Sequence, residues 1–416
     1  MGGELALRRF LYQLDQGAER ALRVHEGHRG SPGSGTRNLV YGASACGHDG
    51  RQGGGAVVDP VADMVEAFAP LLQEHRYRRV RAGRSRELQV RLAQLHERLL
   101  HAVPLDDLAA PRYTPQAQQL REMMATVAPD CPLDTEVMHR RAREATGLTD
   151  FGPDDYRERL ERYVAELNEI DMHPVGIVNF HMQLLQCLKN RLLLTDLVSR
   201  HPQIHDIELQ PPVIIAGLPR SGTTHLHNML AAAPTFRSLP YWESVEPFPL
   251  QAEADLDPDP RIARMDVAVQ TMNTLMPNFA LMHEMTTEHA HEEIQLLAND
   301  FSTMLMETLA HVPRWTEYYW SHDQTTSYEY LVVQLKALQF LRGGRRWVLK
   351  SPQHLGQLPV IERVMPGAVV AFTHRDPVPV ALSMIAMITY SARMYTDAIN
   401  VEEIAAAWVD RLERVL

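Results

Sequence analysis

A glycine-rich turn between two differently patterned segments constrains this chain most. Residues 213–230 read VIIAGLPRSGTTHLHNML: a β-branched run stops at Gly217, and apolar residues then recur at helical spacing from Leu226. A strand, a turn of the form Gly-x4-Gly-Thr-Thr and a helix, in this order, are typical of a phosphate-binding loop. Consecutive backbone N–H groups at the helix N-terminus, together with the helix dipole, attract an anion to such a loop.

The anion held by this loop is not expected to be the terminal phosphates of ATP. Thr223 follows Gly222 at the position where a nucleotide triphosphatase has the lysine that contacts those phosphates. The loop therefore suits a less charged group, bound without Mg²⁺. We expect that group to contact the loop residues Arg220, Ser221, Gly222, Thr223 and Thr224.

Two further strand–helix units follow along the chain. The runs RRWVLKSP and GAVVAFTHRDP are each succeeded by an apolar pattern of helical period. Strands that alternate with helices imply a parallel sheet covered on both faces. The sequence thus predicts an α/β fold: a P-loop NTPase-like parallel sheet flanked by helices, with a helical N-terminal region.

The chain divides into three predicted segments. Residues 1–58 are rich in Gly and Ser and are expected to be flexible or irregular. Residues 59–205 carry helical patterns, among them VADMVEAFAPLLQEH, SRELQVRLAQLHERLLHAV, FGPDDYRERLERYVAELNEI and VGIVNFHMQLLQCLKNRLLLTDLVSRHP. Residues 206–416 form the core, within which residues 237–335 are also largely helical in pattern.

Composition excludes several classes of protein. The formal net charge of −11 argues against a nucleic-acid partner. No apolar run approaches the roughly 18 residues of a membrane-spanning helix, and the first residues lack the apolar core of a signal peptide. Cys46, Cys131 and Cys187 are far apart, which argues against a disulfide framework or a zinc site and favours the cytoplasm. Oligomeric state stays open.

Polar residues follow each of the three predicted strands, where ligands of open α/β sheets bind. The second strand ends at Lys350, and the third is followed by Arg375. Asp376 and the proline after it suit the start of a helix, and Ser383 lies about two turns into that helix. An arginine at the strand end and a serine on the helix can grip one phosphate together.

With these residues in view, residues 145–416 resemble the sulfotransferase superfamily, particularly its branch with a PRSGTT loop, which is frequent in bacterial proteins. RWVLKSPQHL and FTHRDP also resemble this branch. The resemblance implies that the loop binds the 5′-phosphosulfate of 3′-phosphoadenosine 5′-phosphosulfate (PAPS), and that Arg375 and Ser383 bind its 3′-phosphate. It implies transfer of the sulfonate, without a metal, to a hydroxyl of a lipid, a glycan or a small metabolite.

The resemblance also suggests catalytic roles. Arg220 is expected to meet the leaving group, and Lys350 to contact the bridging oxygen or the sulfonate. In several relatives the base is a glutamate shortly after the helix that follows the loop, which corresponds here to Glu243 in LPYWESVEP, with Glu246 as the alternative.

A histidine is the other possible base, as in many sulfotransferases. The segment HEMTTEHAHEEIQLL contains His283 and His291, which we expect to be pocket residues. If this segment is helical, His289, Glu292 and Glu293 share one face. The preceding Met-rich stretch suits either an adaptable acceptor pocket or ordinary core, and the two histidines just after the loop, His225 and His227, suit helix packing.

Two alternatives to an active sulfotransferase stay open. The chain ends inside an apparent helix, whereas the family usually continues, so the core is expected to be C-terminally incomplete. A catalytically degenerate nucleotide-binding relative is therefore one alternative. A P-loop kinase is the other; it predicts Mg²⁺-dependent ATP binding, and Thr223 argues against it.

Overall fold

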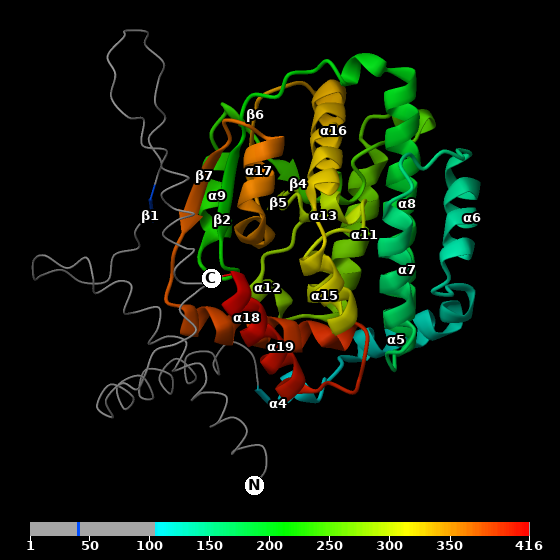
Figure 1. The fold of residues 1–416 in the computed structure, drawn as a ribbon. Helices are drawn as coiled ribbons and strands as arrows, with labels where there is room; N and C mark the ends of the chain where they lie inside the picture. Colours follow the sequence, from blue (N-terminus) through cyan, green and yellow to red (C-terminus); the bar gives the residue numbers. More distant parts are fainter. Residues whose placement is uncertain (1–39, 42–104, 416) are drawn as a thin grey trace, which may run out of the picture.

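The computed structural model describes residues 40–41 and 105–415 (Figure 1). The rest of the predicted flexible segment 1–58, and the helices predicted between residues 59 and 104, lie outside the described residues. The helices before the central sheet are α4 (Leu105–Ala109), α5 (Pro115–Val127), α6 (Thr135–Thr146), α7 (Tyr156–Leu167) and α8 (Pro174–Arg200).

The central sheet has the strand order β1-β7-β2-β6-β3. Its strands are β1 (Val40–Tyr41), β2 (Val213–Gly217), β3 (Phe236–Arg237), β6 (Arg346–Lys350) and β7 (Val369–Thr373). β2 pairs in parallel with both β6 and β7, and β3 pairs in parallel with β6, whereas β1 is antiparallel to β7. The predicted α/β fold with a parallel sheet is therefore confirmed.

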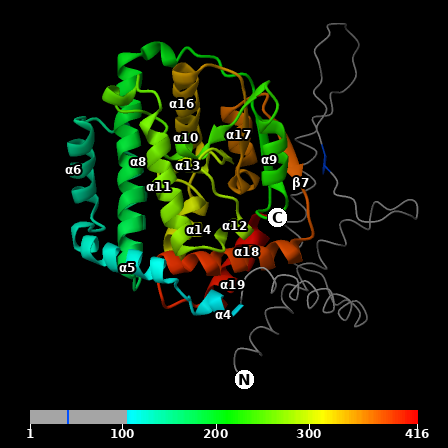
Figure 2. The same cartoon turned by 180° about the vertical axis from the view of Figure 1, so that it is seen from behind.

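Helices cover both faces of the sheet (Figures 1 and 2). Ile214 and Leu349 pack in one apolar cluster with residues of α8, α16 (Thr325–Arg342) and α17 (Leu358–Val364). Ile215 and Val348 point to the opposite face and pack against α9 (Thr223–Ala231). Neighbouring residues of a strand face opposite sides, so strands buried on both faces are apolar throughout.

The predicted helices that precede the first sheet unit are present as α7 and α8. Proline opens α8, the side chain of His173 accepts a hydrogen bond from the N–H of Gly176, and the helix ends before Pro202. The largest core cluster joins α7 and α8 to α14 (Leu305–Leu309), α15 (Pro313–Ser321), α18 (Pro377–Ser391) and α19 (Val401–Val415). In Figure 1, α18 and α19 lie across the lower end of the longer helices.

The segment between the first and second sheet units is largely helical, as predicted. Its helices are α10 (Tyr241–Val245), α11 (Pro260–Leu275), α12 (Phe279–Met282) and α13 (Ile294–Ala298), followed by α14, α15 and α16. Met276 and Met285 of the Met-rich stretch are buried, and Met276 packs against Tyr390 of α18.

The helix considered for residues 283–293 is absent. His291 instead lies in β5 (Ala290–His291), which pairs antiparallel with β4 (Leu239–Pro240). The backbone N–H groups of Tyr241 and Trp242 donate to carbonyl groups of the same segment. These tertiary hydrogen bonds satisfy the segment in an extended form, so the predicted shared helical face of His289, Glu292 and Glu293 was wrong.

Within the described residues, no helix is both long and apolar enough to span a membrane.

Candidate functional site

The three polar clusters meet at one edge of the sheet. Gly217 of β2 lies opposite Thr373 of β7, and Ile215 lies opposite Lys350 of β6. Because the strands are parallel, the loop after β2 and the residues that end β6 and β7 are neighbours. The structure thus brings together residues that are far apart in the chain, such as Ser221 and Thr373, which are 152 positions apart.

The loop is built tightly against β7. A Cβ atom on Gly217 would lie 2.4 Å from Oγ1 of Thr373, so only glycine fits there. The hydroxyl of Ser221 hydrogen-bonds to the same Oγ1 at 2.7 Å. Arg220 has a φ value of +67°, which is strained for a residue with a side chain, and such strain clusters at ligand sites. Gly222 has a φ value of +98°, which glycine adopts readily.

The N-terminus of α9 is open to a ligand. Gly222 precedes the helix, and no side chain caps its first turn. A Cβ on Gly222 would meet no atom within 4 Å, so there is free space beside the loop. Uncapped N–H groups that face open space at a helix N-terminus are suited to bind an anion.

Arg220, Arg375 and Ser383 form a cationic cluster beside the loop. Nε of Arg220 donates to Oγ of Ser383 at 3.1 Å, and Nη1 of Arg375 donates to the carbonyl oxygen of Arg220 at 3.0 Å. Burial, and then the charge of Arg375, lower the pKa of Arg220. Neither guanidinium forms an ion pair with any carboxylate in the described part of the chain. Two adjacent cations without a counter-ion favour an anionic ligand.

Lys350 links the loop to the segment after β5. Its ammonium donates to Oγ1 of Thr224 at 3.3 Å and is ion-paired with Glu292. Its backbone N–H donates to the carboxylate of Glu293 at 2.8 Å. The side chain is only 2% exposed, so Lys350 is a built part of the site and not a solvated lysine.

Three histidines gather at the Lys350 end of the site. Nε2 of His289 and Nδ1 of His291 share a hydrogen bond of 2.8 Å, and the ring of His283 stands edge-on to both. Burial, opposed by the charge of Glu292 and assisted by that of Lys350, lowers the pKa of His283 to about 4. His283 is therefore neutral at pH 7 and able to accept a proton.

The two predicted glutamate bases are engaged elsewhere. The carboxylate of Glu243 is buried and accepts from Arg237 at 3.0 Å, with Arg342 at 3.5 Å. Glu246 is ion-paired with Arg264 at 2.7 Å. Neither carboxylate hydrogen-bonds to the loop, to Lys350 or to Arg375 among the contacts of the described residues.

The sequence did not predict the buried side chains that adjoin the backbone of Lys350. His354 is fully buried; its Nε2 contacts the carboxylate of Glu293, and its Nδ1 shares a 2.9 Å hydrogen bond with the hydroxyl of Tyr328. The hydrogen bond between Thr373 and Ser221 was also not predicted. The available signal for His354 was its position in KSPQH, just after the strand end that carries Lys350, a predicted site residue.

We expect the buried His227 to make the stability of the protein depend on pH. It is fully buried on α9, and neither ring nitrogen has a hydrogen bond of ordinary geometry within the described structure. Burial, and then the charge of Lys350, lower its pKa to about 4. Between pH 6.5 and 4 the unfolded chain binds a proton that the folded chain does not, so stability falls as the pH falls through this window.

The free energy of unfolding of the wild type should fall between pH 7 and pH 4. In His227→Leu we expect this fall to be smaller by roughly 3 kcal/mol, because the buried histidine is gone. Urea denaturation at a series of pH values measures this. His225→Gln, at an exposed position two residues earlier, is the control and should keep the wild-type slope. Identical slopes in His227→Leu and wild type would contradict the assignment.

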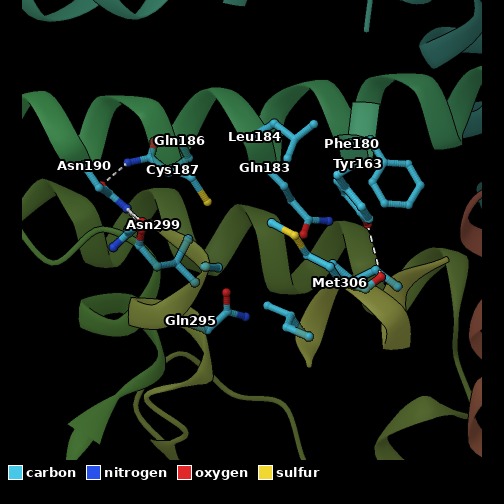
Figure 3. Close-up of a pocket in the computed structure, with 14 residues that line it drawn as sticks. Tyr163, Phe180, Gln183, Leu184, Gln186, Cys187, Asn190, Gln295, Asn299 and Met306 are labelled. Carbon is cyan, nitrogen blue, oxygen red and sulfur yellow. Dashed lines mark hydrogen bonds between the residues drawn. The ribbon is translucent and has the colours of Figure 1, made fainter. Parts of the chain in front are cut away.

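A separate small cavity lies between α8 and the α13–α14 region (Figure 3). Its volume is about 50 Å³, enough for a few water-sized groups at most. Gln186, Asn190 and Asn299 line it and hydrogen-bond to one another in series at 2.8 and 2.9 Å. It contains none of the predicted site residues.

Among the described residues, no three His, Cys, Asp or Glu side chains are grouped so as to hold a metal ion.

Comparison with known proteins gives consistent matches. A family model described as "Sulfotransferase family" matches residues 211–416. The fold is similar to the crystal structure of sulfotransferase STF1 from Mycobacterium tuberculosis (TM-score 0.58, 28% identity, 68% of this chain and 78% of that one). It is also similar to sulfotransferase STF9 from Mycobacterium avium (TM-score 0.59, 24% identity, 68% and 74%), a likeness of fold alone. No curated protein sequence matches significantly.

Proposed function

Because the chain belongs to the sulfotransferase superfamily, we propose that it transfers a sulfonate group from PAPS to a hydroxyl group of a lipid, a glycan or a small metabolite. The observation that carries the proposal is a pair of arginines that have no carboxylate partner among the described residues, beside an uncapped helix N-terminus. Arg375 donates to the backbone carbonyl of Arg220, and the Arg220 guanidinium donates to Ser383. A donor with phosphate groups on both its 5′ and 3′ positions matches this pair of charges.

The loop residues from Arg220 to Thr224 hold the 5′-phosphosulfate in this proposal, and Arg375 with Ser383 holds the 3′-phosphate. The hydrogen bond from Arg220 to Ser383 supports two adjoining phosphate sites, since one guanidinium belongs to both. The open space at Gly222 supports close approach of the ligand to the backbone. The donor supplies the activated sulfonate, and no metal is required.

In the reaction, the acceptor oxygen forms a bond to sulfur while the bond from sulfur to the phosphate oxygen breaks. Arg220 stabilises the negative charge that remains on the phosphate, and Lys350 contacts the sulfonate during its transfer. The acceptor's proton passes to a base. Of the predicted bases we favour His283, since its half-buried ring is neutral at pH 7 and is influenced by the charge of Lys350. His291 is buried, and Glu243 is ion-paired with two arginines.

Calorimetric titration with 3′,5′-ADP, the desulfated donor product, tests the proposal. We expect micromolar affinity, and at least about tenfold weaker binding of 5′-AMP, which lacks the 3′-phosphate. Mg²⁺-ATP is titrated in parallel. Tighter binding of Mg²⁺-ATP than of 3′,5′-ADP would favour a kinase. Binding of 3′,5′-ADP without sulfonate transfer to any of a panel of hydroxyl acceptors would favour a degenerate relative.

The cytoplasmic location stays a prediction. Cys131 and Cys187 are free thiols in the structure, which is compatible with a reducing compartment.

A further inference from the structure

Two consecutive carboxylates hold Lys350 in different ways. Glu293 accepts a hydrogen bond from the backbone N–H of Lys350, and Glu292 pairs with its side-chain ammonium. Neither of these contacts was predicted from the sequence. The surroundings of the two glutamates give them different roles.

Glu293 is immobile. It is 1% exposed, and it takes up an N–H of β6 just beyond the point where the neighbouring strand β3 has ended. Gln353 donates to the Tyr328 hydroxyl at 3.3 Å, Tyr328 contacts His354, and His354 contacts the second oxygen of Glu293. This series of hydrogen bonds gives the buried side chains of Tyr328, His354 and Glu293 polar partners. It holds the Glu293 carboxylate in place beside the end of β6.

Glu292 is held far less firmly. Its side chain is 14% exposed and follows the short strand β5. Within the described residues, its carboxylate has one hydrogen-bond partner, the ammonium of Lys350. That ammonium also donates to Thr224 of the phosphate loop. The ammonium therefore lies between the loop and a carboxylate that has no other hydrogen-bond partner among the described residues.

Resting on the proposed function, we propose that Glu292 is the counter-ion that Lys350 exchanges for the donor's sulfonate. Without the donor, Glu292 neutralises the buried ammonium. A sulfonate held on the loop beside Thr224 competes with Glu292 for that ammonium, because two anions then face one cation. The desulfated product lacks the sulfonate and leaves the pair of Lys350 and Glu292 undisturbed. Glu292 thus lowers the affinity for the donor relative to the affinity for the product. The same competition assists transfer of the sulfonate from the donor to the acceptor.

Glu292→Gln tests this by calorimetry with PAPS and 3′,5′-ADP on the same protein. Removal of the competing charge should tighten PAPS binding about tenfold and change 3′,5′-ADP binding by less than about twofold. The ratio of the two affinities is the readout, since a general change in the charge of the site alters both ligands together. Glu284→Gln makes the same change of charge at an exposed position of the same segment and should leave the ratio unchanged.

The same substitution made in a Lys350→Met variant shows whether the effect of Glu292 on the affinity ratio depends on Lys350. In Lys350→Met, the further change Glu292→Gln should have no effect on the ratio. An unchanged or lowered preference for PAPS in Glu292→Gln overturns the inference, even if Lys350→Met does not fold. Wild-type protein that binds neither ligand overturns the proposed function itself. Wild-type protein that binds both, with an unaltered ratio in Glu292→Gln, overturns only the role of Glu292.

Discussion

Arg375→Ala is expected to weaken binding of 3′,5′-ADP about a hundredfold, or roughly 3 kcal/mol, because a charge-assisted contact to the 3′-phosphate is lost. Binding of 5′-AMP should change much less, since that nucleotide lacks the 3′-phosphate. The guanidinium of Arg375 also supports the loop through the carbonyl of Arg220. Calorimetry with the two nucleotides separates the two contributions, because loss of loop support weakens both.

The matched control is Arg363→Ala. Arg363 is a surface arginine of α17 whose guanidinium donates to Thr325, away from the loop. We expect this variant to bind both nucleotides as wild type does. Equal weakening of 3′,5′-ADP and 5′-AMP by Arg375→Ala would show that Arg375 supports the loop but does not contact a 3′-phosphate. Unaltered binding of both would remove Arg375 from the site.

Asp300→Asn is expected to lower the free energy of unfolding by about 3–5 kcal/mol. It leaves the buried Arg191 without a carboxylate partner among the described residues, and it removes one of the two carboxylates that pair with Arg159. The carboxylate of Asp300 pairs with Arg159 at 2.7 Å and Arg191 at 2.9 Å, and it accepts from Ser327 at 2.6 Å. Arg191 is fully buried, with its guanidinium 3.9 Å from the ring centre of Tyr156. Asp300 thereby joins α7, α8 and α16. Urea denaturation of the full chain measures the effect.

Asp154→Asn serves as the comparison. Asp154 forms an exposed ion pair with Arg157 at 3.0 Å, and the loss of such a pair costs about 0–1 kcal/mol. Both variants remove one negative charge, so a difference between them reports burial and pairing. Similar stabilities would mean that the Asp300 network carries little free energy.

The parts of the fold that follow from local pattern were predictable. The runs of β2, β6 and β7 are apolar on both faces, which is typical of buried parallel strands. Glycines at positions with positive φ or no room for a side chain mark the loop, as Gly217 and Gly222 show. The same rules place Arg375 and Ser383 at the ligand edge, because a parallel topology aligns strand ends without knowledge of side-chain contacts.

Partnerships between distant side chains were not predictable. Glu243 has the spacing of a base along the chain, yet Arg237 and Arg342 reach it from β3 and α16. The segment around His289 has several good helix formers, but hydrogen bonds to residues 239–242 hold it extended. Such contacts depend on which elements pack together, and no local pattern encodes them.

The sequence by itself determined the order of three features along the chain: a glycine-rich loop after β2, a lysine at the end of β6, and an arginine after β7. The spacing of apolar residues and the positions of glycines are local properties, so they can be recognised in the sequence alone. The tertiary structure alone decided which charge each of these cations meets. Among the described residues it gave Arg220 and Arg375 no carboxylate partner and gave Lys350 two, since electrostatic pairing is set by distances between segments that only folding brings together.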